Sequence, residues 1–229
     1  MFFGSVEKPP RLSEFELEVP EKLIAQDPLE KRDECKLMVL NRKNQTIEHR
    51  KFKDVVDYFD KGDVLVMNNT RVYPARLYAN KDKSEARVEV FLLRELADDL
   101  WEAMVKPARK VRIGNKLWFS DTISCDVIDN TVSGGRVLRF ESDAESLYPF
   151  IEKSGHSPLP PYIDRESRPD DKTYYQTVYA SERGSVAAPT AGIHFSKPLL
   201  NKLEKKGVLL SYVTLHIGLG TFRPIMVED

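Results

Sequence analysis

The chain has 229 residues, of which 41% are hydrophobic and 31% are charged. This length and composition allow one large domain or two small ones around a buried core, and they exclude wholesale disorder. The 35 Lys and Arg residues against 36 Asp and Glu residues give a formal net charge of -1. A protein with this balance does not hold nucleic acid by its global charge, so any contact with RNA must come from a local basic patch.

The two cysteines, Cys35 and Cys125, are far apart in the sequence and form no CxxC pair. A disulfide framework and a cysteine-based zinc site are therefore not expected, and the four scattered histidines show no metal-ligand spacing. No signal-peptide stretch follows Met1, and no apolar run approaches the length of a membrane span. We expect a cytoplasmic protein without membrane contact and without a bound metal.

In chain order, the first predicted element is an amphipathic helix over residues 50–62. Its apolar residues recur at helical spacing, and Gly62 offers a stop. Those apolar residues are Phe52, Val55, Val56 and Phe59.

Short runs rich in β-branched and aromatic residues follow, separated by turn residues. The runs are 64–67, 72–77, 88–93, 101–105, 116–119, 125–128 and 137–140. This spacing is typical of an antiparallel barrel or sandwich. With about six strands, a small closed barrel is favoured.

Helical spacing returns over residues 144–153, and the proline-rich segment 158–162 predicts an extended, ordered loop. A second helix is predicted over 198–206, with Gly207 as its cap and an apolar strand over 208–215 after it. A helix followed by a strand indicates an α/β part. We therefore expect an α/β (mixed α+β) domain, residues 1–62 and 143–229, with an inserted antiparallel β-barrel, residues 63–142.

The segment 184–195 is the strongest candidate for a ligand loop, because nearly every residue in it is small. Small residues let a backbone approach a ligand closely and leave its N–H groups free to donate. A tightly packed turn between sheet and helix is the competing interpretation. His194 follows the small residues directly, so a ligand-facing role is weighed for it against that of a packing histidine.

A second candidate loop, 216–223, comes directly after the predicted strand 208–215 and contains Gly218 and Gly220. A dinucleotide fingerprint is excluded, because the third glycine is missing and Pro224 blocks the expected helix. A glycine turn at the carboxyl end of a strand remains a usual place for a ligand. We place His216 on the strand itself, where a buried structural histidine is an equal alternative.

Basic and aromatic side chains form two weaker signals. Arg71 and Arg76, with a basic run over residues 106–112, would suit phosphate contact if they share a face, although a charged loop is more often solvated surface. The tyrosines at 162, 174, 175 and 179, with Gln176, are candidates for stacking on a base, with burial in the core as the alternative.

Taken together, these segments resemble the S-adenosylmethionine:tRNA ribosyltransferase-isomerase family. The matched segments are 23–26 (LIAQ) with Pro28 and 32–33 (RD), 69–72 (NTRV), 74–77 (PARL), 105–109 (VKPAR), 158–163 (PLPPYI), 175–180 (YQTVYA), 184–195 (GSVAAPTAGIHF) and 214–224 (TLHIGLGTFRP). They occur in family order and cover nearly the whole chain. The family continues beyond the position of Asp229, so the resemblance also implies that the α/β part is incomplete at its C-terminus.

The resemblance implies an enzyme that takes S-adenosylmethionine as co-substrate, with no prosthetic group. It transfers and isomerises the ribosyl moiety onto the 7-aminomethyl-7-deazaguanine at the tRNA wobble position. The products are epoxyqueuosine in the tRNA, adenine and methionine. We expect a monomer whose partners are this tRNA and S-adenosylmethionine.

Within the matched motifs, His194 and His216 are the candidate catalytic residues, because imidazole suits acid or base work near neutral pH. The candidate substrate-binding residues are Asn69, Thr70, Arg71, Lys106, Arg109, Tyr162, Gln176, Tyr179, Ser185, Thr190, Gly192, Gly218, Gly220, Thr221 and Arg223. The alternatives are a non-catalytic RNA-binding barrel, an S-adenosylmethionine-binding fragment without full activity, an ordinary methyltransferase and a purely structural scaffold.

Overall fold

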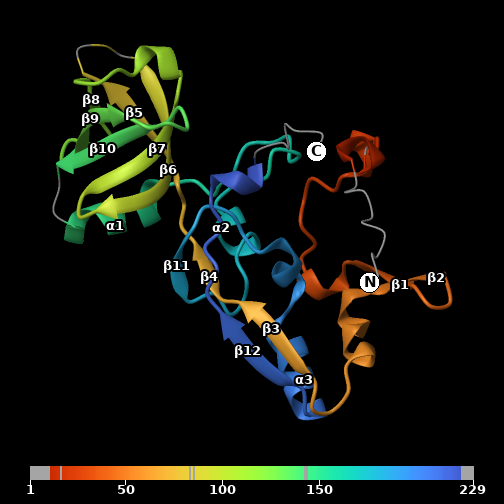
Figure 1. Cartoon of the computed structure of the whole chain (residues 1–229). Helices are drawn as coiled ribbons and strands as arrows, with labels where there is room; N and C mark the ends of the chain where they lie inside the picture. Colours follow the sequence, from red (N-terminus) through yellow and green to blue (C-terminus); the bar gives the residue numbers. More distant parts are fainter. Residues whose placement is uncertain (1–10, 16, 83, 85, 142–143, 223–229) are drawn as a thin grey trace, which may run out of the picture.

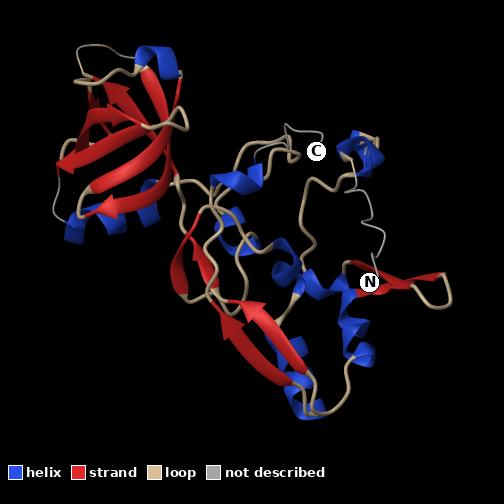
Figure 2. Ribbon diagram, in the orientation of Figure 1, coloured by secondary structure: helices blue, strands red, loops and turns tan. Residues whose placement is uncertain are grey.

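The computed structural model describes the chain except for residues 1–10, 16, 83, 85, 142–143 and 223–229. Figures 1 and 2 show a compact barrel beside a more open part built from two-stranded sheets and short helices. The strands are β1 (Lys36–Asn41), β2 (Thr46–Lys51), β3 (Val64–Asn68), β4 (Thr70–Val72), β5 (Arg76–Lys81), β6 (Arg87–Ala97), β7 (Leu100–Lys106), β8 (Lys116–Trp118), β9 (Ser124–Asn130), β10 (Arg136–Glu141), β11 (Glu182–Ser185) and β12 (Leu209–Val213). The α-helices are α1 (Ala144–Ser154), α2 (Asp171–Tyr174) and α3 (Lys197–Lys206), and the 3-10 helices are η1 (Leu12–Phe15), η2 (Glu21–Leu23), η3 (Arg32–Glu34), η4 (Phe52–Tyr58), η5 (Ala108–Lys110), η6 (Thr190–His194) and η7 (Leu219–Phe222).

Six strands close into an antiparallel barrel in the order β10-β7-β6-β5-β8-β9. Side chains alternate between the interior and the surface along much of β6 and β7. Leu77, Val90, Leu92 and Leu138 are among the interior residues and are at most 1% exposed. Leu147 and Ile151 of α1 join the same core. The predicted small barrel of about six strands is confirmed.

The run 64–67, which we counted first in the series, lies outside the barrel. It forms β3, which pairs in parallel with β12. The run 72–77 is also not one strand, since β4 ends at Val72 and β5 begins at Arg76, with Pro74 in the break. Both errors have one reason: an apolar run predicts a strand but not the partner with which that strand pairs. The barrel strands themselves cover residues 76–141, and the boundary at 63–142 stays a prediction.

The second part contains two parallel pairs, β3 with β12 and β4 with β11. The barrel is therefore inserted between strands that pair with segments more than 100 residues later, and the mixed α+β architecture is confirmed. Helix α3 packs against this part through Leu199, Leu200 and Leu203. The Ser196 hydroxyl accepts from the Leu199 amide at 3.2 Å, and Gly207 ends the helix with a φ of +93°.

The helix predicted over 50–62 is wrong in its extent and type. Strand β2 continues to Lys51, and a 3-10 helix, η4, replaces the α-helix. The Asp54 carboxylate accepts from the Lys51 amide at 3.1 Å and fixes the start of η4. The apolar residues still face α3, because Val56 is buried there and Phe52 packs beside it. Hydrophobic spacing thus predicted the buried face but not the helix type.

In the part of the chain that the structure describes, no helix combines the length and the apolar character needed to cross a membrane.

Candidate ligand-binding site

Three matched motifs meet at one hydrogen-bonded cluster, formed by Thr70, Ser185 and His216. Because β4 and β11 run in parallel, Thr70 and Ser185 lie close together, and both are 0% exposed. The two hydroxyl oxygens are 2.7 Å apart, and Thr70 Oγ1 is 2.9 Å from His216 Nδ1. The Ile217 amide donates to Ser185 Oγ at 2.8 Å. The cluster therefore joins the first and second candidate loops.

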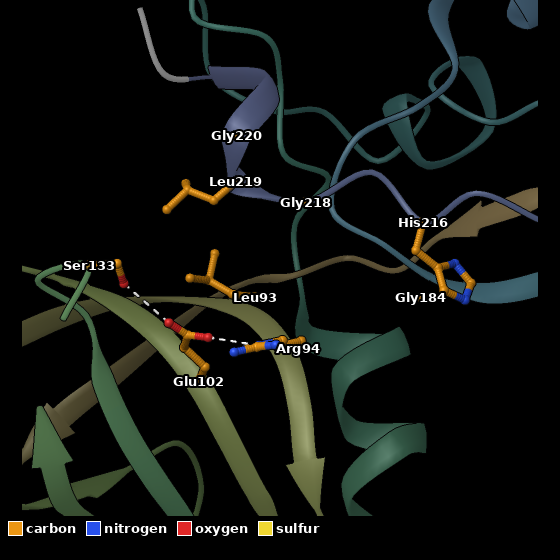
Figure 3. A pocket seen from close by; sticks show the side chains of 9 residues that line it. All are labelled: Leu93, Arg94, Glu102, Ser133, Gly184, His216, Gly218, Leu219 and Gly220. Carbon is orange, nitrogen blue, oxygen red and sulfur yellow. Dashed lines mark hydrogen bonds and ion pairs between the residues drawn. The ribbon is translucent and has the colours of Figure 1, made fainter. Parts of the chain in front are cut away.

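Gly184 makes room for His216. A Cβ atom at position 184 would lie 2.5 Å from His216 Cε1 and 2.6 Å from both ring nitrogens. Figure 3 shows the imidazole beside the Gly184 backbone. The glycine is thus required by the close approach of an aromatic ring.

A cavity of about 350 Å³ opens in front of this cluster. Its lining comes from the barrel on one side and from the two loops on the other: Leu93, Arg94, Glu102, Ser133, Gly184, His216, Gly218, Leu219 and Gly220 (Figure 3). A Cβ at Gly218 or Gly220 would meet nothing within 4 Å, so the loop backbone is open to the cavity. A cavity with a bare glycine backbone, an imidazole and charged groups on the far wall suits a polar small molecule.

The barrel wall of this cavity carries an ion pair. Arg94 Nε donates to Glu102 at 2.8 Å, and Ser133 Oγ donates to the other carboxylate oxygen at 3.1 Å. Burial raises the pKa of Glu102, but the hydrogen bonds from Arg94 and Ser133 outweigh burial and hold that pKa below its ordinary value. Glu102 is therefore ionised at neutral pH, and the barrel wall presents a carboxylate with its paired guanidinium to the cavity.

The structure corrects the placement of His216. Strand β12 ends at Val213, so His216 lies in the loop after the strand, and its side chain is exposed rather than buried. Thr221, three residues beyond Gly218, is exposed in η7, where its amide donates to the Gly218 carbonyl at 3.3 Å. Arg223 lies outside the described residues.

His194 lines a different cavity, of about 470 Å³, between the segment 23–36 and the end of η6. Cys35 Sγ lies 3.2 Å from His194 Nδ1, and the Phe52 ring packs beside the imidazole. Burial lowers the pKa of His194, and the Arg32 charge lowers it further. The two candidate catalytic histidines therefore lie at different cavities.

Arg32 was missed as a site residue, although it holds the His194 loop. Its guanidinium donates to the carbonyls of Gln176, Ile193 and Thr173 at 2.8, 3.1 and 3.1 Å. Burial lowers the pKa of Arg32, as expected for a guanidinium that is partly removed from water. Arg32 belongs to the matched residues 32–33, but its contacts could not be read from the sequence, because all three partners lie more than 140 residues later.

Two amides predicted to bind substrate are engaged by the protein itself. Gln176 accepts from the Val72 amide at 3.0 Å and donates to the Val72 carbonyl at 2.9 Å. Asn69 Oδ1 accepts from the Thr214 hydroxyl at 2.7 Å. These contacts hold β4 and its neighbours in place.

Four more predicted residues lie around η6 and the proline-rich loop. Gly192 is buried against the Tyr179 hydroxyl, where a Cβ would overlap the phenol oxygen, and burial raises the pKa of Tyr179. Thr190 is exposed at the start of η6. Tyr162 is 53% exposed, and its carbonyl accepts from Gln26 Nε2 at 3.1 Å.

The basic residues that we predicted to bind substrate and that the structure describes do not line either of these two cavities. Arg71 pairs with Glu152 at 3.5 Å, while Lys106 and Arg109 are exposed at the end of β7 and in η5. The barrel wall formed by Leu93, Arg94, Glu102 and Ser133 was missed, because those residues carry no motif and meet the loops only in the fold. Among the described residues, no three His, Cys, Asp or Glu side chains are grouped closely enough to hold a metal ion.

The family model described as "Queuosine biosynthesis protein" matches residues 12–229, and the chain belongs to this family. Curated relatives named S-adenosylmethionine:tRNA ribosyltransferase-isomerase share high identity with it. That of Flavobacterium psychrophilum is 57% identical over 225 residues, which are 96% of this chain and 64% of the relative. That of Cytophaga hutchinsonii is 52% identical over 224 residues, with the same two coverages of 96% and 64%. The chain thus spans 64% of the length of these relatives.

A solved structure, the S-adenosylmethionine tRNA ribosyltransferase of Thermotoga maritima, is 34% identical to the chain. The match covers 89% of this chain and 58% of the other, with a TM-score of 0.36.

Proposed function

We propose that the chain acts in tRNA modification as an S-adenosylmethionine:tRNA ribosyltransferase-isomerase. It would transfer and isomerise the ribosyl moiety of S-adenosylmethionine onto the 7-aminomethyl-7-deazaguanine at the wobble position, and release adenine and methionine. Membership in the queuosine family and the names of the relatives support this proposal. The observation that carries it is the meeting of Thr70, Ser185 and His216 with an open glycine backbone at one cavity.

The proposed chemistry places clear demands on such a cavity. A sulfonium acidifies the neighbouring ribose 5′ carbon, so a positioned base can start the reaction by removing a proton. The departing adenine needs a hydrogen-bond or proton donor, and the reactive intermediate must be kept from water. Glu102 suits the positive sulfonium by its charge, and the glycine backbone offers N–H donors to the carboxylate of the methionine part.

His216 and His194 remain the proposed catalytic side chains, the first at the cavity between barrel and loops and the second at the cavity beside Cys35. Lowering of the pKa of His194 by burial keeps that imidazole neutral at pH 7, which a base requires. We further propose that the protein works as a cytoplasmic monomer without a prosthetic group, and light scattering of the purified chain tests its oligomeric state.

The test is to incubate the 229-residue chain with S-adenosylmethionine and tRNA that carries the deazaguanine precursor, and to separate the small products. Release of adenine and methionine in equal amounts is expected. S-adenosylhomocysteine would instead identify a methyltransferase. Thermal stabilisation by S-adenosylmethionine without any product would indicate a binding fragment, and retention of tRNA alone an RNA-binding module; either result overturns the proposal.

Replacement of each histidine by alanine tests the catalytic assignment. We expect His216→Ala and His194→Ala to lower adenine release by about 10²–10⁴-fold, the usual contribution of a general acid or base. Binding of S-adenosylmethionine, followed by the shift in melting temperature, should persist. Normal turnover in either variant would remove that histidine from the catalytic residues. His49→Ala on the exposed strand β2 is the matched control.

A further inference from the structure

We infer that the Thr70 and Ser185 hydroxyls fix the tautomer of His216, so that its imidazole offers an N–H donor at Nε2 and not a free base. The inference deepens the proposed function by naming the form in which His216 meets a ligand, and in that respect it rests on the proposed function. Thr70 and Ser185 are then positioning residues rather than substrate-binding ones.

The direction of the hydrogen bonds follows from the main chain. The Ile217 N–H donates to Ser185 Oγ at 2.8 Å, since a backbone amide has no other role. Ser185 is 0% exposed, and its hydroxyl proton needs an acceptor. Among the described residues its partner is Thr70 Oγ1, at 2.7 Å, so Ser185 donates to Thr70.

Thr70 then has one proton to give and two acceptors within reach. His216 Nδ1 is 2.9 Å away, while the Glu182 carbonyl is 3.5 Å away. The longer contact lies outside the usual range for an O–H donor, so the Thr70 hydroxyl donates to Nδ1. A ring nitrogen that accepts carries no proton, and a neutral imidazole then carries its proton on Nε2.

The opposite direction is disfavoured by burial. If Nδ1 carried the proton and donated to Thr70, the Thr70 hydroxyl would have to donate to Ser185 Oγ or to the Glu182 carbonyl. In the first case Ser185 would accept twice and its own buried proton would lack an acceptor in the described part of the chain. In the second, Thr70 would depend on the 3.5 Å contact while accepting from both neighbours. The order in which the Ile217 amide, Ser185 and Thr70 donate in turn, ending at His216 Nδ1, is the one in which every buried group is satisfied.

His216 lines the cavity, and within the described residues its Nε2 has no hydrogen-bond partner. The cavity ligand is therefore expected to place an acceptor there, such as a ring nitrogen or a carboxylate oxygen. A leaving adenine offers such a nitrogen, so His216 would assist departure as a hydrogen-bond donor, and proton removal from the ribose would belong to another group.

The tautomer is measured by long-range ¹H–¹⁵N NMR of the histidine-labelled chain in alkaline buffer, where imidazole rings are neutral. His216→Gln identifies the His216 signals among the four histidines. We expect the pattern of a ring protonated at Nε2. A ring protonated at Nδ1 in the unchanged protein overturns the inference directly, whether or not any variant folds.

Variants of Thr70 and Ser185 test how strongly each hydroxyl influences the tautomer of His216. Thr70→Val removes the donor to Nδ1 and should convert the His216 signals into those of a mixture of tautomers, while Thr70→Ser should restore the Nε2–H pattern. Ser185→Ala leaves the Thr70 donor in place and should change the pattern less. Thr46→Val, on the exposed strand β2, is the control and should change nothing. An unaltered tautomer in folded Thr70→Val contradicts the inference.

Adenine release by the same variants separates this inference from the proposed function. If both hold, Thr70→Val lowers the rate about tenfold or more, with S-adenosylmethionine binding retained and Thr70→Ser active. If the NMR pattern is as expected but no variant and no wild type releases adenine, the tautomer assignment stands and the proposed function fails. If adenine is released and Thr70→Val is fully active, the role of the tautomer in catalysis is wrong.

Discussion

The barrel and the remainder of the chain differ in how completely their strands are paired and their apolar side chains are buried. Each barrel strand pairs on both sides, and among the residues that the structure describes twenty buried ones form its core. The other part has two-stranded sheets and a core of seven buried residues. Its strands expose large apolar side chains, among them Met38 and Leu40 of β1 and Val66 of β3, which are 64%, 62% and 58% exposed.

The chemistry-bearing residues lie in the less closed part. Thr70, Ser185 and His216 come from β4, β11 and the loop after β12, while the barrel contributes a wall to their cavity. Loops beside the wall of a closed barrel are a usual place for a ligand site. We therefore expect the barrel to be more stable than the remainder of the chain. We also expect the ligand site to lose its structure when the less stable part unfolds.

The largest expected effects come from removing core side chains in each part. Leu138 of the barrel and Leu203 of α3 are both 0% exposed. Replacement by alanine should cost about 2–5 kcal/mol of unfolding free energy in the part concerned. Both tryptophans, Trp101 and Trp118, belong to barrel strands, so their fluorescence during urea unfolding reports the barrel.

If the two parts unfold separately, Leu138→Ala lowers the midpoint of the tryptophan transition and Leu203→Ala leaves it unchanged, while circular dichroism detects the loss in the α3 part. A shift of the tryptophan midpoint by Leu203→Ala would instead mean that the two parts unfold as one cooperative unit, and the expected difference in their stability would be wrong. Val132→Ala, at a fully exposed barrel turn, is the control.

The buried ion pair between Arg165 and Asp171 should have the next largest effect, and it depends on pH. Two hydrogen bonds of 2.8 Å join the guanidinium to the carboxylate, whose side chain is 2% exposed. Burial raises the pKa of Asp171, but the bonds from Arg165 and from the Arg168 amide outweigh burial and lower that pKa. The stabilisation is therefore present above the unfolded pKa, near 3.9, and is lost as the pH falls through the lower folded pKa.

Asp171→Asn should cost about 3 kcal/mol at neutral pH, because it leaves a largely buried guanidinium with only the exposed Asp27, 3.7 Å from its Nε, as a charge partner. It should also remove part of the loss of stability of the wild type below about pH 4. Urea unfolding at several pH values measures both effects. The exposed pair of Arg50 with Glu48 on β2 lies outside this network, and Glu48→Gln should change stability by less than about 1 kcal/mol. Equal pH dependence in Asp171→Asn and wild type would contradict the assignment.

Gly184→Ala tests the less closed part at the ligand site. The added Cβ overlaps the His216 ring, so the ring must move away from Thr70. We expect adenine release to fall by about 10²-fold, comparable to the loss of a well-placed catalytic group. The tryptophan transition of the barrel should stay within about 0.5 kcal/mol of wild type, because the change lies outside the barrel. Retained activity would show that the loops adapt around the new methyl group.

Sequence patterns predicted the strands and helices that depend on local spacing. They did not predict strand pairing or side-chain contacts between segments that are far apart in the sequence. The spacing of short β-rich runs such as 88–93 and 101–105 predicted the barrel, and Gly207 was correctly predicted as the cap of α3. The pairing of β3 with β12 joins residues nearly 150 positions apart, which no local pattern contains. The tautomer-setting contact of Thr70 with His216 is missed for the same reason.

The smallest expected effect is that of Val66→Thr on β3, and the buried neighbour Met67, which faces the opposite way, serves as its contrast. Met67 is 4% exposed and packs with the α3 core, whereas Val66 is 58% exposed. Met67→Ala should cost about 2–5 kcal/mol, while Val66→Thr should change stability by less than about 0.5 kcal/mol.

Parallel strands are usually covered on both faces, so a bare apolar face on β3 and β12 is a surface suited to association. If Val66→Thr costs more than about 1 kcal/mol, and if that cost grows with protein concentration, copies of the chain cover this face in solution. A cost that is large but independent of concentration would mean that the less closed part buries this face within a single chain, and the contrast with the barrel would then disappear.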